Sequence, residues 1–164
     1  MGSAIIVDLD GTLTSCEHRR HFVTNGNKNW RDFNYNIPFD APVPGVRDIV
    51  WGAWDNGTPV VFCSGRSQDY YAETVEWLFD HVFDPYMTDR PEDAMIDYQL
   101  LMRGFDDYRN DAVVKKDIYD WRIKPFYDIE FVVDDRWPVI QMWESLGLFV
   151  LRVTDPGLEP IYER

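Results

Sequence analysis

Short apolar runs rich in β-branched residues alternate with helix-like segments along this chain, and this alternation constrains the fold most. The runs that resemble buried strands cover residues 4–7, 59–63, 98–102, 129–133 and 149–153. The segments with helical spacing or helix-end signals cover residues 46–55, 67–79, 111–124 and 138–146. We expect Tyr71, Val75 and Leu78 to share an apolar face in the second of these. In the third we expect Asp111 to cap the helix, and Val114, Ile118 and Trp121 to share its apolar face. The order predicts a three-layer α/β/α sandwich around a mostly parallel five-stranded sheet with right-handed crossovers.

Composition places the chain among ordinary globular proteins. Its 164 residues are 45% hydrophobic and 16% aromatic, which excludes a disordered chain and predicts one domain, 1–164, with a small cap or flap insert at about 14–42. No apolar run approaches the ~20 residues of a membrane span, and Asp8 and Asp10 interrupt the first run, so we expect no signal peptide. Cys16 and Cys63 suggest reduced thiols. We therefore expect a cytoplasmic protein without membrane association and without an evident obligate protein partner.

The first apolar run ends in a pair of carboxylates, in the sequence Asp8-Leu9-Asp10-Gly11-Thr12. Side chains two residues apart in an extended segment point the same way, so Asp8 and Asp10 leave the strand end together, and Gly11 permits a sharp turn. Such a pair can bind a cation, attack an electrophile or move a proton. A calcium loop is excluded because no regularly spaced oxygen ligands or closing Glu follow, whereas a plain strand-end turn remains the alternative.

Polar residues also follow two other predicted strands. Ser64 ends the run 59–63, and Asp134 and Asp135 end the run 129–133. Ligands of parallel α/β sheets bind beyond the carboxyl ends of the strands, so we expect these residues to gather with Asp8 and Asp10. Four carboxylates facing a phosphate require a cation, and an all-oxygen ligand set indicates Mg²⁺.

These residue types suit phosphoryl transfer. Asp8 can be the nucleophile that forms an aspartyl-phosphate, and Asp10 can protonate the leaving oxygen and then act as a base for water. Ser64 can donate to a phosphate oxygen at the start of the next helix, although it can equally help Ser67 to cap that helix. Either Lys115 or Lys116 can neutralise the transferring group.

Charge is distributed unevenly along the chain. The net charge of −13 argues against a protein that coats nucleic acid through phosphate contacts. The stretch 14–35 is locally positive and carries aromatic residues, which suits either a contact surface for a nucleic-acid strand or an ordinary loop. The acidic stretch 80–97 suggests a solvated excursion. The sequence assigns no role to His18, Arg20 and His21.

Four motifs carry a family resemblance. The Asp8–Thr12 segment resembles the first signature of the haloacid dehalogenase-like phosphatases, and three further segments resemble the others: Phe62-Cys63-Ser64-Gly65-Arg66, Val113-Val114-Lys115-Lys116 and Val132-Val133-Asp134-Asp135-Arg136. Within that superfamily the chain is most similar to the 3′-phosphatase domain of phage polynucleotide kinase-phosphatases. That similarity rests on Arg103, Asp107, Arg109 and Asp111 before the lysine motif, and on Val139, Met142-Trp143 and Gly147 after it.

The resemblance implies roles for particular residues. The catalytic residues would be Asp8, Asp10, Ser64, Lys115 and Asp135, and the substrate-binding residues Thr12, Arg19, Gly65 and Arg66. Magnesium would bind Asp8, the carbonyl oxygen of Asp10, and Asp134, with Asp135 as a water-mediated or second-layer partner. Arg66 and Arg109 can alternatively form structural ion pairs. The Rossmann-like fold of the superfamily agrees with the sheet predicted above.

The resemblance also implies a substrate. A 3′-phosphate, or a 2′,3′-cyclic phosphate, at a polynucleotide end of RNA or DNA is the expectation, because a small insert leaves the site open to a bulky substrate. No Gly-x-x-x-x-Gly-Lys-Ser/Thr loop is present, so no kinase domain is expected within these residues. The alternatives are a nucleotidase, a small-metabolite phosphatase and a non-catalytic binding module with the same fold. The spacing between Ser64-Gly65-Arg66 and Tyr70-Tyr71 is shorter than in the family, which affects the substrate entrance.

Overall fold

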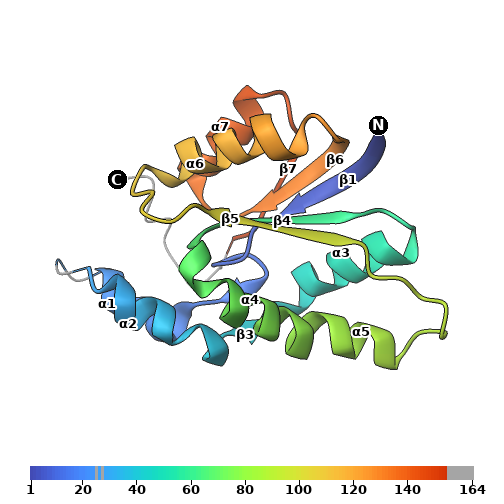
Figure 1. The fold of residues 1–164 in the computed structure, drawn as a ribbon, viewed down its shortest axis with the longest axis horizontal. Helices are drawn as coiled ribbons and strands as arrows, with labels where there is room; N and C mark the ends of the chain where they lie inside the picture. The colour runs from blue at the N-terminus through green and yellow to red at the C-terminus, as the bar shows by residue number, and fades with distance from the viewer. Residues whose placement is uncertain (25, 27, 155–164) are drawn as a thin grey trace.

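Five parallel strands form the central sheet in the order β5-β4-β1-β6-β7 (Figure 1). The computed structural model describes residues 1–24, 26 and 28–154. The strands are β1 Gly2–Val7, β4 Val60–Ser67, β5 Tyr98–Arg103, β6 Tyr127–Asp134 and β7 Val150–Arg152. All five lie at the predicted places, and the predicted three-layer α/β fold is confirmed.

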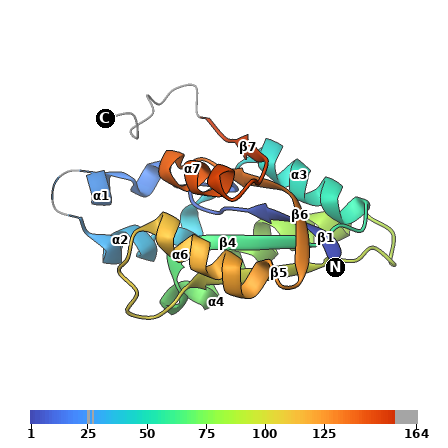
Figure 2. The ribbon, with the colours of Figure 1, turned by 90° about the horizontal axis from the view of Figure 1, so that it is seen from above.

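Helices cover both faces of this sheet (Figures 1 and 2). The helices on one face are α3 Pro44–Asp55, α4 Tyr71–Leu78 and α5 Asp84–Thr88, and those on the other are α6 Asp111–Ile118 and α7 Trp137–Ser145. A hydrophobic core lies on each face of the sheet, and alternate residues of β1 belong to one or the other. Ile5 and Val7 pack toward α3 and α4, and Ala4 and Ile6 pack toward α6 and α7. The continuous apolar pattern of the strand therefore reflects burial on both faces.

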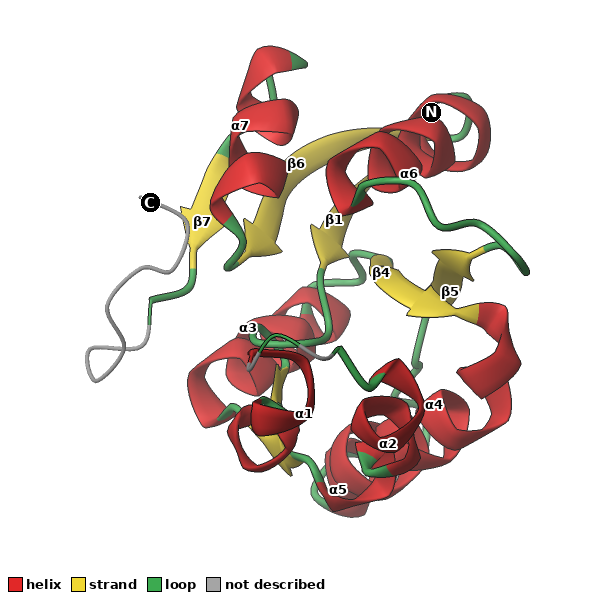
Figure 3. Ribbon diagram, turned by 90° about the vertical axis from the view of Figure 1, so that its left-hand side faces the viewer, coloured by secondary structure: helices red, strands yellow, loops and turns green. Residues whose placement is uncertain are grey.

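The insert between β1 and α3 lies at the carboxyl ends of the strands, which face the viewer in Figure 3. It contains β2 Thr14–Ser15, a 3₁₀ turn Glu17–Arg19, α1 His21–Thr24, α2 Trp30–Tyr35, a 3₁₀ turn Ile37–Phe39 and β3 Ala41–Pro42. The strands β2 and β3 pair antiparallel and close the insert at its base. Among the described residues, no helix is long and apolar enough to cross a membrane. The cytoplasmic location stays a prediction.

The prediction that 80–97 is a solvated excursion is wrong for its first half. The helix α4 continues through a π-helical turn, Phe79–Phe83, into α5. Val82, Phe83 and Tyr86 are buried in the core on this face, and the acidic residues of the segment are exposed. The aspartates dominated the composition, while the apolar residues that decide burial recur at helical spacing between them.

Two predicted helix faces also need correction. Tyr71 was predicted to share the apolar face of its helix, but it is 47% exposed, and Thr74 and Trp77 are buried instead. Trp121 was predicted to lie on the buried face of α6, but it is 76% exposed. A π-helical turn, Tyr119–Ile123, widens the spacing after α6, so the buried face passes to Tyr119 and Ile123.

The start of α6 differs by one residue from the prediction that Asp111 caps it. Asn110 is the capping residue, and its side-chain oxygen accepts a hydrogen bond from the backbone N–H of Ala112. Asp111 is therefore the first helical residue. Its carboxylate oxygen Oδ2 lies 3.9 Å from Nζ of Lys115, one turn later in the helix.

Candidate active site

Three carboxylates and one lysine meet at the carboxyl ends of β1 and β6. We call Asp8, Lys115, Asp134 and Asp135 the carboxylate–lysine cluster. The ammonium group of Lys115 donates to Asp8 Oδ1 at 2.7 Å and to Asp134 Oδ2 at 3.0 Å, and all three residues are buried. Two strand ends and the first turns of α6 therefore converge on one point, as the sheet topology requires.

Neighbouring side chains hold this cluster in place. The Thr12 hydroxyl lies 3.1 Å from both Asp8 Oδ2 and Asp135 Oδ1, and the indole N–H of Trp143 donates to Asp134 Oδ2 at 3.2 Å. Gly11 has a φ of +81°, and a Cβ at this position would overlap the carboxylate of Asp135. Glycine is therefore needed here both for the backbone conformation and for the close approach of Asp135.

The protonation of the cluster follows from burial and crowding. Burial raises the pKa of Asp8 well above its ordinary value, with Lys115 opposing the shift and Asp134 adding to it. Burial and the neighbouring Asp134 raise the pKa of Asp135 to about 6. Burial alone would lower the pKa of Lys115, but the carboxylates that face it raise it instead. Lys115 is therefore charged, and the cluster contains this one positive charge and three carboxyl groups.

The residues present fit a hard divalent cation. Asp8, Asp134 and Asp135 each offer a carboxylate oxygen, and these oxygens lie within 4.8 Å of one another. Their donor set is all oxygen, and the charge of Lys115 alone does not balance them. Asp135 thus contributes directly to the acidic group, and the carboxylate of Asp10 faces elsewhere. The predicted contact of the Asp10 carbonyl oxygen with a metal stays a prediction.

A second group of charged residues lies beside the first. We call Asp10, Arg19, Arg66 and Asp40 the arginine–carboxylate cluster. Arg19 donates to both oxygens of Asp40, through Nε and Nη2 at 2.6 Å each, and through Nη2 also to Asp10. Arg66 donates through Nη2 to Asp10 Oδ1 at 2.6 Å and to Asp40 Oδ2 at 3.2 Å. Two carboxylates and two guanidinium groups therefore form one neutral network.

This network keeps Asp10 ionised. Burial would raise the pKa of Asp10, but Arg66 and Arg19 hold it well below its usual range. The Arg19 guanidinium stacks on the Phe33 ring at 4.1 Å and donates to the Phe33 carbonyl oxygen, which anchors it to the insert. Its side chain is fully buried, so the insert carries a structural part of the site.

Asp40 is a site residue that the sequence analysis missed. It follows a short 3₁₀ turn in the insert, is 2% exposed, and accepts hydrogen bonds from both arginines and from His18. Its backbone oxygen accepts from the Trp77 indole N–H at 2.8 Å, which ties the insert to α4. The residue precedes no recognisable motif. The sequence held one indication of such a residue: no carboxylate had been assigned as the partner of Arg19 or Arg66.

The last part of β4, where its pairing with β5 becomes irregular, brings Ser64, Gly65 and Arg66 to the same edge. The Ser64 hydroxyl accepts from the backbone N–H of Arg66, two residues later in the same strand, at 3.1 Å. Ser67, by contrast, caps the next 3₁₀ turn through the N–H of Asp69. Gly65 packs so closely against Asp111 that a Cβ would overlap its carboxylate. Ser67 thus ends β4 and caps the turn that follows, and Ser64 lies three residues before it in the irregular part of the strand.

Other predicted residues lie outside these clusters. Lys116 is exposed and pairs with Asp120, so Lys115 is the lysine that points into the site. Arg109 is exposed and pairs with Asp107 and Asp117, which agrees with the alternative prediction that it forms structural ion pairs. Arg20 pairs with Glu17 on the surface of the insert, and the His21 ring packs against Phe22.

Known proteins share this fold. Two solved chains from structures of the Pnkp1/Rnl/Hen1 RNA repair complex are 29% and 28% identical, with TM-scores of 0.72 and 0.70; 93% of this chain aligns with 42% and 46% of theirs. The class C acid phosphatase from Bacillus anthracis, at 16% identity, has a TM-score of 0.65 over 96% of this chain and 68% of its own, and shows the fold alone.

A curated relative comes from Autographa californica nuclear polyhedrosis virus and is described as a bifunctional polynucleotide kinase/RNA ligase. It is 28% identical over 146 residues, which are 88% of this chain and 18% of the relative. The chain thus spans less than a fifth of that relative's length and less than half of the two repair-complex chains.

Fold and site together define a haloacid dehalogenase-like phosphatase domain, a hydrolase of phosphate esters. Within this class the chain belongs to the family of polynucleotide kinase PNKP phosphatase domains, whose model matches residues 2–157.

Proposed function

We propose that this protein is a Mg²⁺-dependent phosphomonoesterase that removes the 3′-phosphate, or a 2′,3′-cyclic phosphate, from polynucleotide ends during nucleic-acid repair. The observation that carries the proposal is the contact of Lys115 with both Asp8 and Asp134 in a chain of this family. A carboxylate held against a buried ammonium group is positioned for attack on a phosphorus atom, and the ammonium group stabilises the charge that develops there.

Asp8 is the nucleophile of the first step. One of its carboxylate oxygens forms a bond to phosphorus, and the bond from phosphorus to the 3′-oxygen of the nucleotide breaks. Asp10 passes a proton to the departing oxygen, and it must take up that proton when the substrate binds, because Arg19 and Arg66 keep its carboxylate ionised in the free site. The product of the step is an aspartyl-phosphate on Asp8 and a free 3′-hydroxyl.

In the second step Asp10 acts as a base. It takes a proton from a water molecule, whose oxygen attacks the phosphorus atom of the aspartyl-phosphate and releases inorganic phosphate with Asp8 regenerated. Arg19 and Arg66 favour the carboxylate form of Asp10, which suits this step. Ser64, Gly65 and Lys115 hold the phosphate oxygens through both steps, and Thr12 holds the carboxylate of Asp8 in line.

A divalent cation would be held by Asp8, Asp134 and Asp135 together with the carbonyl oxygen of Asp10. When bound, it supplies positive charge that offsets the repulsion between the acidic residues and the phosphate. We propose Mg²⁺ because the donor atoms are oxygens.

A polynucleotide end is favoured over a small metabolite by two observations. The insert at 14–42 contains only short elements and covers one side of the site, and the carboxylate side chain of Asp10 remains 26% exposed. Structures of an RNA repair complex contain related chains. Because that assembly holds further proteins, we do not propose that this protein acts without a partner.

Phosphate release from matched substrates tests the proposal. We expect release from a short 3′-phosphorylated oligonucleotide in the presence of Mg²⁺, and little release from its 5′-phosphorylated counterpart. Rapid release from mononucleotides with none from the oligonucleotide would favour the nucleotidase, and no release from any substrate would favour a binding module.

A further inference from the structure

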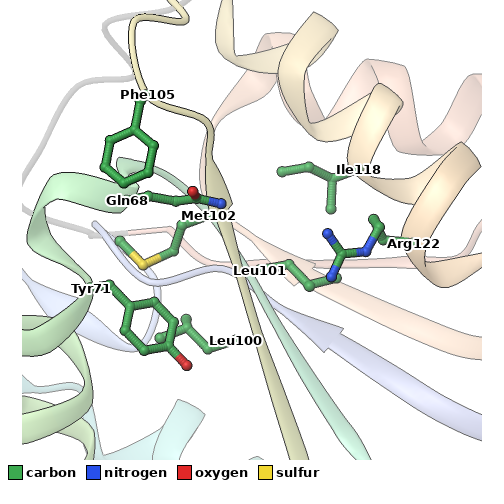
Figure 4. A pocket seen from close by; sticks show the side chains of 8 residues that line it. All are labelled: Gln68, Tyr71, Leu100, Leu101, Met102, Phe105, Ile118 and Arg122. Atoms are coloured by element: carbon green, nitrogen blue, oxygen red, sulfur yellow. The ribbon is translucent and has the colours of Figure 1, made fainter.

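A cavity of about 380 Å³ opens beside β5, the edge strand next to β4 (Figure 4). Building on the proposed function, we propose that this cavity binds the nucleobase of the terminal nucleotide, whose 3′-phosphate lies at Asp8. Phe105 and Tyr71 would pack against the faces of the base, Met102 would form the floor, and Gln68 would contact the edge of the base.

The cavity lies one strand away from Ser64 and Gly65, the predicted phosphate-binding residues of β4. In the pairing of β4 with β5, Met102 is the partner of Ser64. Neighbouring strands lie about 4.8 Å apart, and Gln68 directly follows β4. A nucleotide whose phosphate sits beside Ser64 therefore has its base within reach of the cavity.

The loop that carries Phe105 is tied to Gly65 by one side chain. Arg103 donates through Nε to the carbonyl oxygen of Gly65 at 2.7 Å. Through Nη1 it donates to the carbonyl oxygens of Asp107 and Arg109, at 3.1 and 2.6 Å. The position of Phe105 is thus coupled to the position of Gly65, so that base and phosphate contacts are set together.

The side chains around the cavity have the chemistry that single-stranded bases require. Phe105 and Tyr71 are 64% and 47% exposed, so both side chains are accessible to an incoming group, whereas Met102 is buried. In Figure 4 Gln68 and Met102 are drawn between the two rings. Aromatic faces that stack on a base, with an amide at its edge, are how proteins commonly hold unpaired bases.

A second cavity, of about 250 Å³, lies beside the insert and differs from the first in the charge of its lining. That second cavity also has aromatic walls, Tyr35, Phe39 and Tyr70, but it contains the carboxylate of Glu73, which would repel a phosphodiester backbone. The charged residue that lines the cavity beside β5 is Arg122. A guanidinium group there can contact the next backbone phosphate of the strand.

The test compares two 3′-phosphorylated oligonucleotides that differ only in the last base, which is present in one and absent in the other. We expect the intact protein to have a KM about tenfold to a hundredfold lower for the strand with the base. Phe105→Ala should raise KM by a similar factor for that strand, leave KM for the abasic strand unchanged, and leave kcat unchanged for both. The comparison is made with RNA and with DNA strands.

Phe149→Ala is the matched control. Phe149 is 67% exposed and lies next to β7 at the opposite edge of the sheet, so its loss should change neither KM. Equal KM values of the unaltered protein for the two strands would overturn the base-binding cavity while the phosphatase activity stands. Release of phosphate from neither strand would instead overturn the proposed function, and the cavity assignment would fall with it.

Discussion

The carboxylate–lysine cluster and the arginine–carboxylate cluster begin two residues apart on one strand end, yet they solve opposite electrostatic problems. The first contains three acids and one ammonium group, so burial raises the pKa of Asp8 and Asp135. The second contains two acids and two guanidinium groups, and these lower the pKa of Asp10. The first cluster is thus short of positive charge, and the second is balanced.

This difference assigns separate tasks to the two aspartates of the opening motif. A cluster that lacks positive charge can accept a cation and a phosphate without disrupting internal ion pairs. A balanced network of buried ion pairs instead holds one side chain in one orientation and one protonation state. Environments that push the pKa values of neighbouring acids apart are a usual sign of divided roles in acid–base chemistry.

Replacing Asp8 should have the largest effect. Asp8→Asn removes the proposed nucleophile while the size of the side chain is kept, so phosphate release should fall by at least about a thousandfold. Steady-state release of inorganic phosphate from the 3′-phosphorylated oligonucleotide measures this. A variant that keeps more than a tenth of the activity would exclude the aspartyl-phosphate mechanism.

Asp40→Asn tests whether the second cluster is a balanced network. The change leaves two buried guanidinium groups facing one carboxylate, and breaking a buried pair in this way costs about 3–5 kcal/mol of unfolding free energy. Urea denaturation followed by tryptophan fluorescence measures the loss.

Asp55→Asn is the control for Asp40→Asn. Asp55 also pairs with an arginine, Arg90, but at the surface, and its replacement should leave the denaturation midpoint nearly unchanged. Equal losses for the two variants would mean that Asp40 has no special place in the network.

Adjacent lysines sharpen the comparison further. Lys115→Met removes the only cation of the first cluster and should lower phosphate release by about a hundredfold. Lys116→Met removes an exposed lysine that pairs with Asp120, and should leave the rate unchanged. The rate of phosphate release is measured for both variants under the same conditions. Similar rates for the two would contradict the role given to Lys115.

The sequence was sufficient for the sheet and for the residues at its strand ends. Apolar runs determine which segments enter a parallel sheet, and the topology then brings their carboxyl ends together, so Asp8, Ser64 and Asp134 were predictable as neighbours. The lysine could be narrowed only to the adjacent residues Lys115 and Lys116. Neighbouring helical positions point about 100° apart, so which of the two faces the site depends on how the helix packs against the sheet.

Features that depend on tertiary contacts were not predictable. Asp40 gained its role because the insert folds back over Arg19 and Arg66, and no local pattern encodes that contact. The π-helical turn after α6 changed which residues face the core, since one additional residue per turn displaces the 3.6-residue periodicity on which the prediction for Trp121 relied.

The response to Mg²⁺ distinguishes the two clusters by stability rather than by activity. An ion that binds only the native protein, at a hundred times its dissociation constant, adds about 2.7 kcal/mol to the unfolding free energy. We expect an increase of this order for the unaltered protein and little increase for Asp134→Asn. Asp10→Asn should retain the increase, because it keeps the backbone carbonyl oxygen predicted to contact the metal and alters only the side chain bound by the arginines.

Differential scanning fluorimetry with and without Mg²⁺ measures the shift in each variant. Loss of the shift in Asp10→Asn together with its retention in Asp134→Asn would reverse the assignment of the two clusters, and the cation site would then belong beside Arg19 and Arg66.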